Sequence, residues 1–356
     1  MSQSQFDQTR AETFADRVVE TLNGGALALM TSLGHRAGLF DALAEAGAVS
    51  SAELAERAGL NERYVREWLG AMTSGGFVEL EAEGRYLLPA EHAASLTRKA
   101  GSDNIAVLSQ YIGLLGTVED SILRCFREGG GVPYSEFGRF QEVMAEDSGM
   151  STLPALIDTI VPLLPCSAAA FEAGIEVLDV GCGSGRIINL LAKTFPRSQF
   201  VGYDFSSDAI KTAREEARSQ ALENVSFEER DASQFDEPAR YDVITAFDAI
   251  HDQAYPRKVL ANVARGLKPG GIFLMQDIGA CTHHHGNVEH PIGPLLYTVS
   301  CMHCMTVSLA SGGEGLGAMW GEQKARELLA EAGFGSVEVH RLEHDIQNYY
   351  YVCRKD

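Results

Sequence analysis

One stretch constrains the fold more than any other: a strand-like run that ends in three closely spaced glycines, EVLDVGCGSGR at residues 176–186. A helix-like run follows at residues 187–193, so the chain must turn sharply through Gly181, Gly183 and Gly185. Glycines let backbone N–H groups approach a ligand closely, because no Cβ intervenes. The next strand-like segment, VGYD, ends on Asp204, and a carboxylate there can accept hydrogen bonds from both hydroxyls of a ribose. The pattern predicts a site for a nucleoside-containing cofactor.

The spacing of the glycines distinguishes two classes of cofactor. The dinucleotide fingerprint is G-x-G-x-x-G, whereas this chain has G-x-G-x-G with Asp179 two residues before the first glycine. This pattern resembles motif I of class I S-adenosylmethionine (SAM) methyltransferases. Three later segments agree with that family in order: RDAS at 230–233, YDVITAFDAIHD at 241–252 and LKPGGIFLMQD at 267–277. The resemblance implies SAM as cofactor, S-adenosylhomocysteine as product and no metal.

The resemblance extends over nearly the whole chain, to a bacterial, mycobacterium-like group of methyltransferases with an N-terminal winged-helix domain and no assigned substrate. LNERYVREWLGAM (60–72) and YTVSCMHCMTVSLA (297–310) carry much of it. We therefore expect an α/β protein, a Rossmann-like methyltransferase sheet preceded by an all-helical, winged-helix domain. The expected parts are a winged-helix dimerisation and substrate domain at 1–100, a helical linker and lid at 101–171, and the SAM-binding domain at 172–356. An insertion at 279–320 is expected to lie over the active site.

The resemblance and the ends of the predicted strands indicate which residues bind the cofactor. Asp179 and the glycines are expected at the methionine end and Asp204 at the ribose. Asp231 and Ala232 are expected at the adenine, and Phe247 at the exit of the fourth strand. The full predicted set is Asp179, Gly181, Gly183, Asp204, Phe205, Asp231, Ala232 and Phe247.

Methyl transfer needs an acceptor held close to the methyl group, shielded from water and deprotonated. His251 is the predicted base, with Asp252 beside it, because both follow the fourth strand; the alternative is that His251 only caps the next helix. The loop GGGVPYSEFGRF (129–140) has the composition of a lid. The predicted acceptor pocket is Tyr111, Tyr134, Phe137, His284 and His303.

The segment at 281–304 combines a histidine run with one Cys-x-x-Cys pair, which invites a zinc interpretation. A histidine lies between the two cysteines and the flanks are apolar, so buried free thiols on a helix are the better interpretation. Histidines 283–285 are expected on a loop over the pocket, where they would orient an anionic acceptor.

Charge and composition narrow the partners. The net charge of −20 disfavours binding to nucleic acid and to anionic membranes, and no apolar run is long enough to span a bilayer. The polar N-terminus lacks a signal-peptide core, and seven scattered cysteines suit a reducing cytoplasm. Residues 26–43 offer more apolar side chains than one small domain can bury, which predicts a homodimer through the N-terminal helices.

The function predicted from these features is methyl transfer from SAM to a small molecule. The sulfur-rich, histidine-lined candidate pocket favours a small thiol or hydrosulfide as acceptor, and a hydroxyl of an aromatic or lipid-like metabolite is the alternative. A function of another class is a SAM-sensing regulator that binds DNA through the winged helix. Against it, Arg63 and Arg66 of the second helix have Glu62 and Glu67 beside them, whereas a recognition helix presents an uncompensated basic face.

Overall fold

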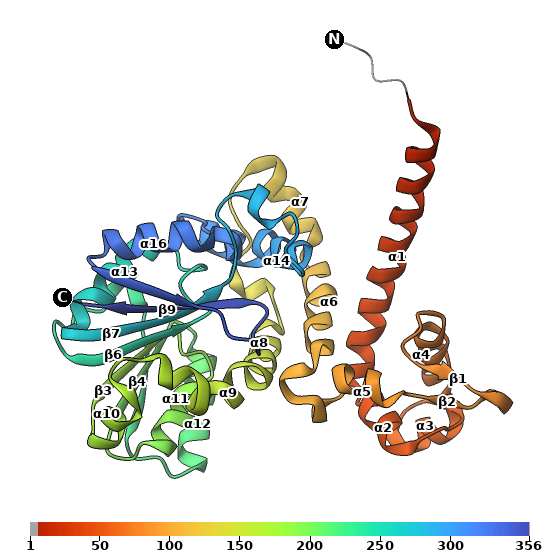
Figure 1. Ribbon diagram of the computed structural model, residues 1–356, viewed down its shortest axis with the longest axis horizontal. Helices are drawn as coiled ribbons and strands as arrows, with labels where there is room; N and C mark the ends of the chain where they lie inside the picture. The colour runs from red at the N-terminus through yellow and green to blue at the C-terminus, as the bar shows by residue number, and fades with distance from the viewer. Residues whose placement is uncertain (1–5, 356) are drawn as a thin grey trace. The chain divides into compact units, whose positions relative to one another are not determined.

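The computed structural model describes residues 6–355 and divides into two compact units, Met1–Leu114 and Leu115–Asp356 (Figure 1). The first unit is mainly helical with one short hairpin. Its helices and strands are α1 (Gln8–Arg36), α2 (Leu39–Ala46), α3 (Ser51–Ala58), α4 (Glu62–Ser74), β1 (Glu79–Leu80), β2 (Tyr86–Leu87), α5 (Ala90–Leu96) and α6 (Gln110–Gly116), the last of which crosses the boundary between the units.

Local signals in the sequence explain where the helices of the first unit begin. Ser50 caps α3 in a reciprocal capping box with Glu53, and Asn61 caps α4 by accepting a bond from the Arg63 N–H. The β1–β2 hairpin pairs in antiparallel register and forms the wing. The core of this unit packs Phe40 edge-to-face against Trp68, whose indole N–H donates to the Met30 carbonyl at 2.9 Å.

The second unit begins with helices and continues as a seven-stranded sheet. The helices before the sheet are α7 (Glu119–Glu128), α8 (Phe140–Met150), α9 (Thr152–Ala155) and α10 (Ser167–Ala173). The strands are β3 (Glu176–Val180), β4 (Gln199–Asp204), β5 (Val225–Glu229), β6 (Tyr241–Phe247), β7 (Leu267–Ile278), β8 (Ser336–His340) and β9 (Asn348–Arg354). Their order in space is β5-β4-β3-β6-β7-β9-β8, and β3 to β7 run parallel while β9 runs antiparallel to both neighbours. This mostly parallel, doubly wound sheet confirms the fold class predicted from the sequence.

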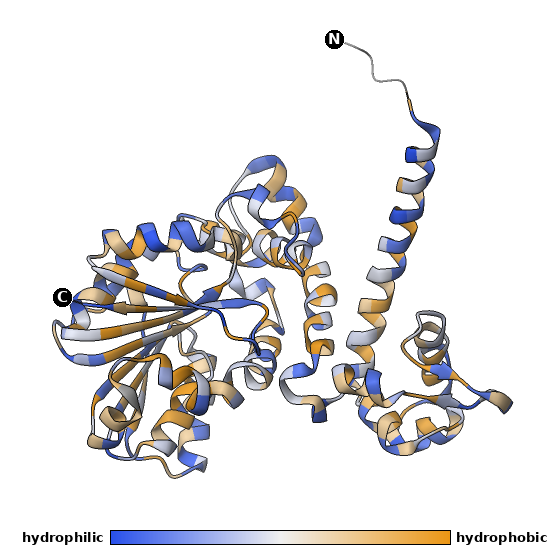
Figure 2. Ribbon diagram, in the orientation of Figure 1, coloured by the Kyte–Doolittle hydropathy of each residue, from blue (hydrophilic) through white to orange (hydrophobic). Residues whose placement is uncertain are grey.

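Helices cover both faces of this sheet (Figure 1). One face packs against α13 (Pro256–Gly266) and α16 (Gly321–Glu331), and the other against α10, α11 (Arg186–Thr194) and α12 (Ser207–Ser219). Because both faces are buried at the centre of the sheet, the central strands are mostly apolar, as Figure 2 shows for β6 and β7. Between β7 and α16 lie α14 (Gly293–Val299), a π-helical turn at Ser300–Cys304 and α15 (Met305–Ala310).

The parallel arrangement brings the carboxyl ends of β3, β4, β5, β6 and β7 to one edge of the sheet. Ligands of such sheets bind at that edge, beside the strand where the order reverses, which here is β3. In the part of the chain that the structure describes, no helix is both long and apolar enough to cross a membrane.

Candidate active site

The glycine turn after β3 has the backbone geometry that its sequence predicts. Gly181, Gly183 and Gly185 all have positive φ, at 74°, 52° and 74°. The Gly181 N–H donates to the Tyr203 carbonyl at 2.8 Å, which ties the turn to β4. A Cβ at Gly181 would stand 2.5 Å from the Cβ of Ala249, and one at Gly185 would stand 2.6 Å from the Phe227 ring. A Cβ at Gly183 would meet no atom within 4 Å, so this residue faces open space where a ligand can approach the backbone.

A cavity of about 350 Å³ lies at the carboxyl edge of the sheet, a size typical of small-ligand pockets. Its lining comes from the turn after β3, the ends of β4 and β5, the loop after β6 and helix α15. The residues are Tyr134, Gly181, Tyr203, Asp204, Phe205, Arg230, Asp231, Ala232, Ser233, Asp252, Gln253, Ala254, Tyr255, Val307 and Ser311. Five of the eight predicted cofactor residues line it: Gly181, Asp204, Phe205, Asp231 and Ala232.

Asp204 is held in place by two backbone N–H groups. Gly183 donates to Oδ2 at 2.9 Å and Ser206 donates to Oδ1 at 2.8 Å. Burial raises the pKa of Asp204 above its ordinary value, although both N–H bonds oppose the rise. Each carboxylate oxygen accepts more than one hydrogen bond, so both retain capacity for ribose hydroxyls.

Asp231 lies at the end of β5 in a more open position. Its Oδ1 accepts the Ser233 N–H at 2.8 Å and its Oδ2 accepts the Gln234 side-chain amide at 2.9 Å. Burial acts to raise the pKa of Asp231, but these bonds and Lys258 hold it below its ordinary value. The site therefore combines two carboxylates at the edge of the sheet with an open glycine backbone, a donor set that fits the ribose, adenine and amino-acid parts of SAM.

Three predicted cofactor residues lie outside the lining of the cavity. Asp179 is 2% exposed and accepts the Thr245 hydroxyl at 2.7 Å, and burial raises its pKa to about 7. Gly183 contributes its N–H to Asp204 rather than a wall of the cavity. Phe247 packs against the apolar core on the α11–α12 face. Their roles toward the cofactor remain predictions.

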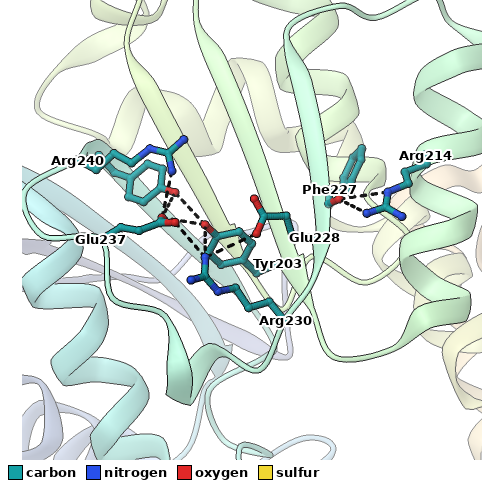
Figure 3. A network of polar contacts seen from close by, with 8 residues as sticks. Tyr203, Arg214, Phe227, Glu228, Arg230, Glu237 and Arg240 are labelled. Atoms are coloured by element: carbon teal, nitrogen blue, oxygen red, sulfur yellow. Dashed lines mark hydrogen bonds and ion pairs between the residues drawn. The ribbon is translucent and has the colours of Figure 1, made fainter.

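A polar network that sequence reasoning missed includes two residues of the cavity lining, Tyr203 and Arg230 (Figure 3). Glu237 Oε2 accepts the hydroxyls of Tyr203 at 2.8 Å and Tyr241 at 2.6 Å, and Glu237 Oε1 accepts Arg230 Nη1 at 2.9 Å. Burial acts to raise the pKa of Glu237, yet these donors and Arg240 lower it to about 2, so it is ionised. Tyr203 and Arg230 also line the cavity, so their bonds to Glu237 fix the positions of two side chains in its wall. A carboxylate with this spacing to two tyrosines carries no sequence motif, so no signal identified it.

His251 pairs with Asp277 at the carboxyl ends of the neighbouring strands β6 and β7. Its Nδ1 lies 2.8 Å from Asp277 Oδ1, and the same oxygen accepts the Trp320 indole N–H at 2.9 Å and the Ile278 N–H at 2.8 Å. His251 is 4% exposed and Asp277 is fully buried. The thiol of Cys304 also hydrogen-bonds the His251 ring. Burial acts to lower the pKa of His251, but Asp277 and Cys304 together raise it well above its ordinary value.

Asp252, the second predicted catalytic residue, lines the cavity directly after His251. Burial raises its pKa to about 6, which His251 partly offsets. Asp248, four residues before Asp252, has a positive φ of 48° and its Oδ2 accepts the Gln276 amide at 3.2 Å. Strained backbone of this kind concentrates at functional sites, and it marks the exit of β6 as one.

The predicted acceptor residues are spread over different environments. Tyr134 lines the cavity, and Phe137 and His303 lie behind it, with the His303 ring 5.4 Å from the Tyr134 ring and 4.7 Å from the Phe137 ring. His284 lies in a short helical turn with its ring edge against Tyr297, outside the lining of the cavity. Tyr111 belongs to the first unit.

The cysteine- and histidine-rich segment forms the π-helical turn at Ser300–Cys304, with Cys304 buried and Cys301 partly buried as free thiols. Among residues 6–355 no group of three histidine, cysteine or carboxylate side chains is arranged to hold a metal ion. The imidazoles of His283 and His285 stack on each other at 5.6 Å.

Comparisons with known proteins agree with this fold. Residues 171–338 match the family described as "Methyltransferase domain", and residues 25–98 match the "Rv2258c-like winged HTH domain". A fatty-acid O-methyltransferase of Mycolicibacterium smegmatis is 37% identical over 114 residues, covering 31% of this chain and 40% of that protein. A ubiquinone biosynthesis O-methyltransferase of Leptothrix cholodnii is 32% identical over 107 residues, covering 30% of this chain and 45% of that protein. The chain thus spans less than half the length of these curated relatives.

Solved structures are similar over the whole chain. The SAM complex of human N-acetylserotonin methyltransferase has a TM-score of 0.68 and 19% identity, covering 100% of this chain and 99% of that one. At this level of identity the similarity concerns the fold. Fold, cavity and family matches together define a class I methyltransferase domain whose cofactor is SAM. The chain thus carries a methyltransferase domain at residues 171–338 and an Rv2258c-like winged-helix domain at residues 25–98.

Proposed function

We propose that the protein transfers the methyl group of SAM to a hydroxyl of a small aromatic or lipid-like molecule. One observation carries the proposal. His251 forms a buried pair with Asp277, and the residue that follows His251 in the chain, Asp252, lines the cofactor cavity. This pairing has the form of a general base held by an orienting carboxylate.

The need for a base favours a hydroxyl over other acceptors. A phenolic hydroxyl has a pKa near 10 and must lose its proton as it attacks, whereas a carboxylate with a pKa near 4 is already ionised. A thiol, with a pKa near 8.5, needs little help, so a dedicated pair is least necessary there. The cavity also carries Asp204, Asp231 and Asp252, which would repel an anionic acceptor. The named relatives act on oxygen, and the comparisons lend no support to the thiol acceptor that the sequence favoured.

The roles of the residues follow from their contacts. Asp277 accepts the Nδ1 proton of His251, which leaves Nε2 as the proton acceptor. SAM, when bound, supplies a methyl group activated by its positive sulfur. His251 Nε2 would take the proton of the acceptor hydroxyl. The acceptor oxygen would then bond to the methyl carbon as the sulfur–methyl bond breaks, with S-adenosylhomocysteine as the leaving group. The apolar ring of Tyr134 and the walls of the cavity exclude water.

The test is SAM consumption with matched panels of phenols and thiols. We expect phenols to turn over, His251→Ala to lower kcat/KM by about 10²–10⁴-fold, and Asp277→Asn to lower it less, with SAM affinity nearly unchanged. A near-normal rate in His251→Ala, or thiol turnover with inert phenols, would contradict the proposal.

For the winged-helix unit we propose dimerisation rather than DNA recognition. On α4, Arg66 Nη2 lies 2.6 Å from Glu62 and Arg63 contacts Glu67, so both arginines of the candidate recognition helix are neutralised. On α1, Phe14, Val19 and Leu22 are exposed, which supports an apolar interface with a second copy. All seven cysteines are free thiols, which supports a reducing cytoplasm as the working compartment.

A further inference from the structure

His303 is the one histidine of the site whose hydrogen bonds are unaccounted for. It is 1% exposed, and neither ring nitrogen has a hydrogen-bond partner among residues 6–355. A neutral imidazole carries one donor and one acceptor, and leaving such a group buried without a partner costs about 1–3 kcal/mol. Burial, reinforced by His251, lowers the pKa of His303 to about 3, so the ring is neutral at physiological pH.

Two lines of geometry connect His303 to the cavity. His303 precedes Val307 by four residues and Ser311 by eight, so the three lie along one face of the π-helical turn and α15, and the latter two line the cavity. Ring contacts also connect His303 to the cavity. The ring of Tyr134 lies edge-on to the His303 ring at 5.4 Å and to the Phe205 ring at 5.7 Å. Tyr134 and Phe205 are both cavity residues.

The surroundings of His303 are flat and apolar. Its ring stacks on Phe140 at 3.4 Å with an interplanar angle of 6°, and the edge of Phe137 lies at 4.7 Å. These rings hold the imidazole in place but offer its nitrogens no hydrogen-bond partner. π-helical turns such as Ser300–Cys304 are frequent at functional sites.

We propose that His303 is a specificity-determining residue, which hydrogen-bonds a second, uncharged oxygen on the aromatic ring whose hydroxyl is methylated. This inference rests on the proposed O-methyl transfer and narrows its acceptor to a ring with two oxygen functions, hydroxyl or carbonyl. A neutral imidazole suits an uncharged partner, so the anionic acceptor expected from the histidine-rich segment is not favoured. An acceptor that lacks the second oxygen would leave the ring nitrogens of His303 without a hydrogen-bond partner. The site should therefore bind such an acceptor more weakly.

The experiment compares phenol with 1,2-, 1,3- and 1,4-dihydroxybenzene, which differ only in the second oxygen. Binding to the protein saturated with S-adenosylhomocysteine is measured by calorimetry, and kcat/KM is measured with SAM. We expect at least one dihydroxybenzene to exceed phenol by about tenfold or more, as a hydrogen bond to a buried unsatisfied group implies. His303→Phe should reduce that ratio to near one and leave the melting temperature unchanged or raised, and His303→Gln should restore part of the ratio.

His344→Phe is the matched control. His344 Nε2 is also without a partner in the described chain, but the His344 ring contacts Tyr350, which does not line the cavity, whereas the His303 ring contacts the cavity residue Tyr134. The inference is overturned if wild-type protein binds no dihydroxybenzene better than phenol, or if His303→Phe keeps the preference. Failure of the proposed function has a different signature: rates insensitive to His251→Ala, whatever the binding ratios are.

Discussion

At the scale of single residues, the site depends on how burial and neighbouring charges set protonation. The buried Asp277 carboxylate outweighs desolvation and raises the pKa of His251 well above its ordinary value. Asp277 Oδ1 accepts three hydrogen bonds, from His251, Trp320 and Ile278, which fix the carboxylate in place. The imidazole therefore gains its neutral, basic form at a higher pH than an ordinary histidine does.

The raised pKa of His251 predicts the pH dependence of catalysis. Because the folded pKa of His251 is raised, kcat/KM should increase with pH and reach its midpoint above 6.5. Asp277→Asn removes the charge that raises the pKa, so the midpoint should move to lower pH while the limiting rate falls by about tenfold or more. Because the pKa of His251 is higher in the folded than in the unfolded protein, the His251–Asp277 pair stabilises the fold. This contribution is fully present below pH 6.5 and is lost as the pH rises through the pKa of His251 in the folded protein. A rate profile measured on both proteins checks this, and a midpoint that stays in place or rises would refute it.

At the scale of elements, the glycine turn has one position packed against its neighbours and one that faces open space. Gly185 has its space filled by Phe227 and Ala213, whereas Gly183 faces open space at φ 52°. Both positions disfavour a side chain through their backbone conformation, by about 1–2 kcal/mol. Only Gly185 adds a steric clash to this cost.

The two glycines therefore form a matched pair of variants. Gly185→Ala should lower the melting temperature substantially, since its Cβ would lie 2.6 Å from Phe227 and 2.7 Å from Ala213. Gly183→Ala should fold with a smaller loss but bind S-adenosylhomocysteine about tenfold more weakly or worse. Thermal melts and calorimetry distinguish the two effects. Unchanged affinity in a folded Gly183→Ala protein would show that the turn does not contact the cofactor.

The segment that carries Tyr134 is fastened to α15 at one glycine. A Cβ on Gly131 would stand 2.0 Å from the Thr306 carbonyl oxygen, and the next residue, Val132, donates its N–H to Thr306 Oγ1 at 2.8 Å. Gly131→Ala should force this segment away and raise KM for the acceptor by about tenfold. Gly138→Ala is the control, because its Cβ would meet nothing within 4 Å. Equal KM values in the two variants would exclude this contact as a determinant of acceptor binding.

Much of the fold and part of the site could be predicted from the sequence. The turn at Gly181 and the acid at Asp204 were recognisable because they are local and closely spaced along the chain. The orienting role of Asp277 was missed, because its pairing with His251 depends on the register of β6 and β7, in which Phe247 lies opposite Gln276. The sequence did contain a useful signal. Asp277 lies near the end of β7, His251 follows β6, and the carboxyl ends of neighbouring parallel strands meet at one edge of the sheet. The burial of His303 depends on tertiary packing with Phe140 and had no local signal.

At the scale of the whole molecule, the exposed apolar side chains of α1 bear on the oligomeric state. Helix α1 exposes Phe14 and Leu22, at 66% and 68%, along its length. Exposed apolar residues along one helix are typical of an interface. We therefore expect a dimer in solution that forms through α1.

Light scattering tests the dimer directly. Phe14→Glu combined with Leu22→Glu should convert the protein to a monomer, because it places charges in an apolar interface. Leu80→Glu, a change at an exposed apolar residue of the wing, should leave the dimer intact. A monomer mass for the wild-type protein, or a dimer that survives the double change, would show that α1 is not the interface.

The most direct test of the whole site is a crystal structure of the protein with S-adenosylhomocysteine. We expect the ribose hydroxyls on Asp204, the adenine beside Asp231 and Ala232, and the sulfur facing the space between His251 and His303. A ligand bound elsewhere, or a sulfur directed away from His251, would contradict the assignment of this cavity as a methyl-transfer site.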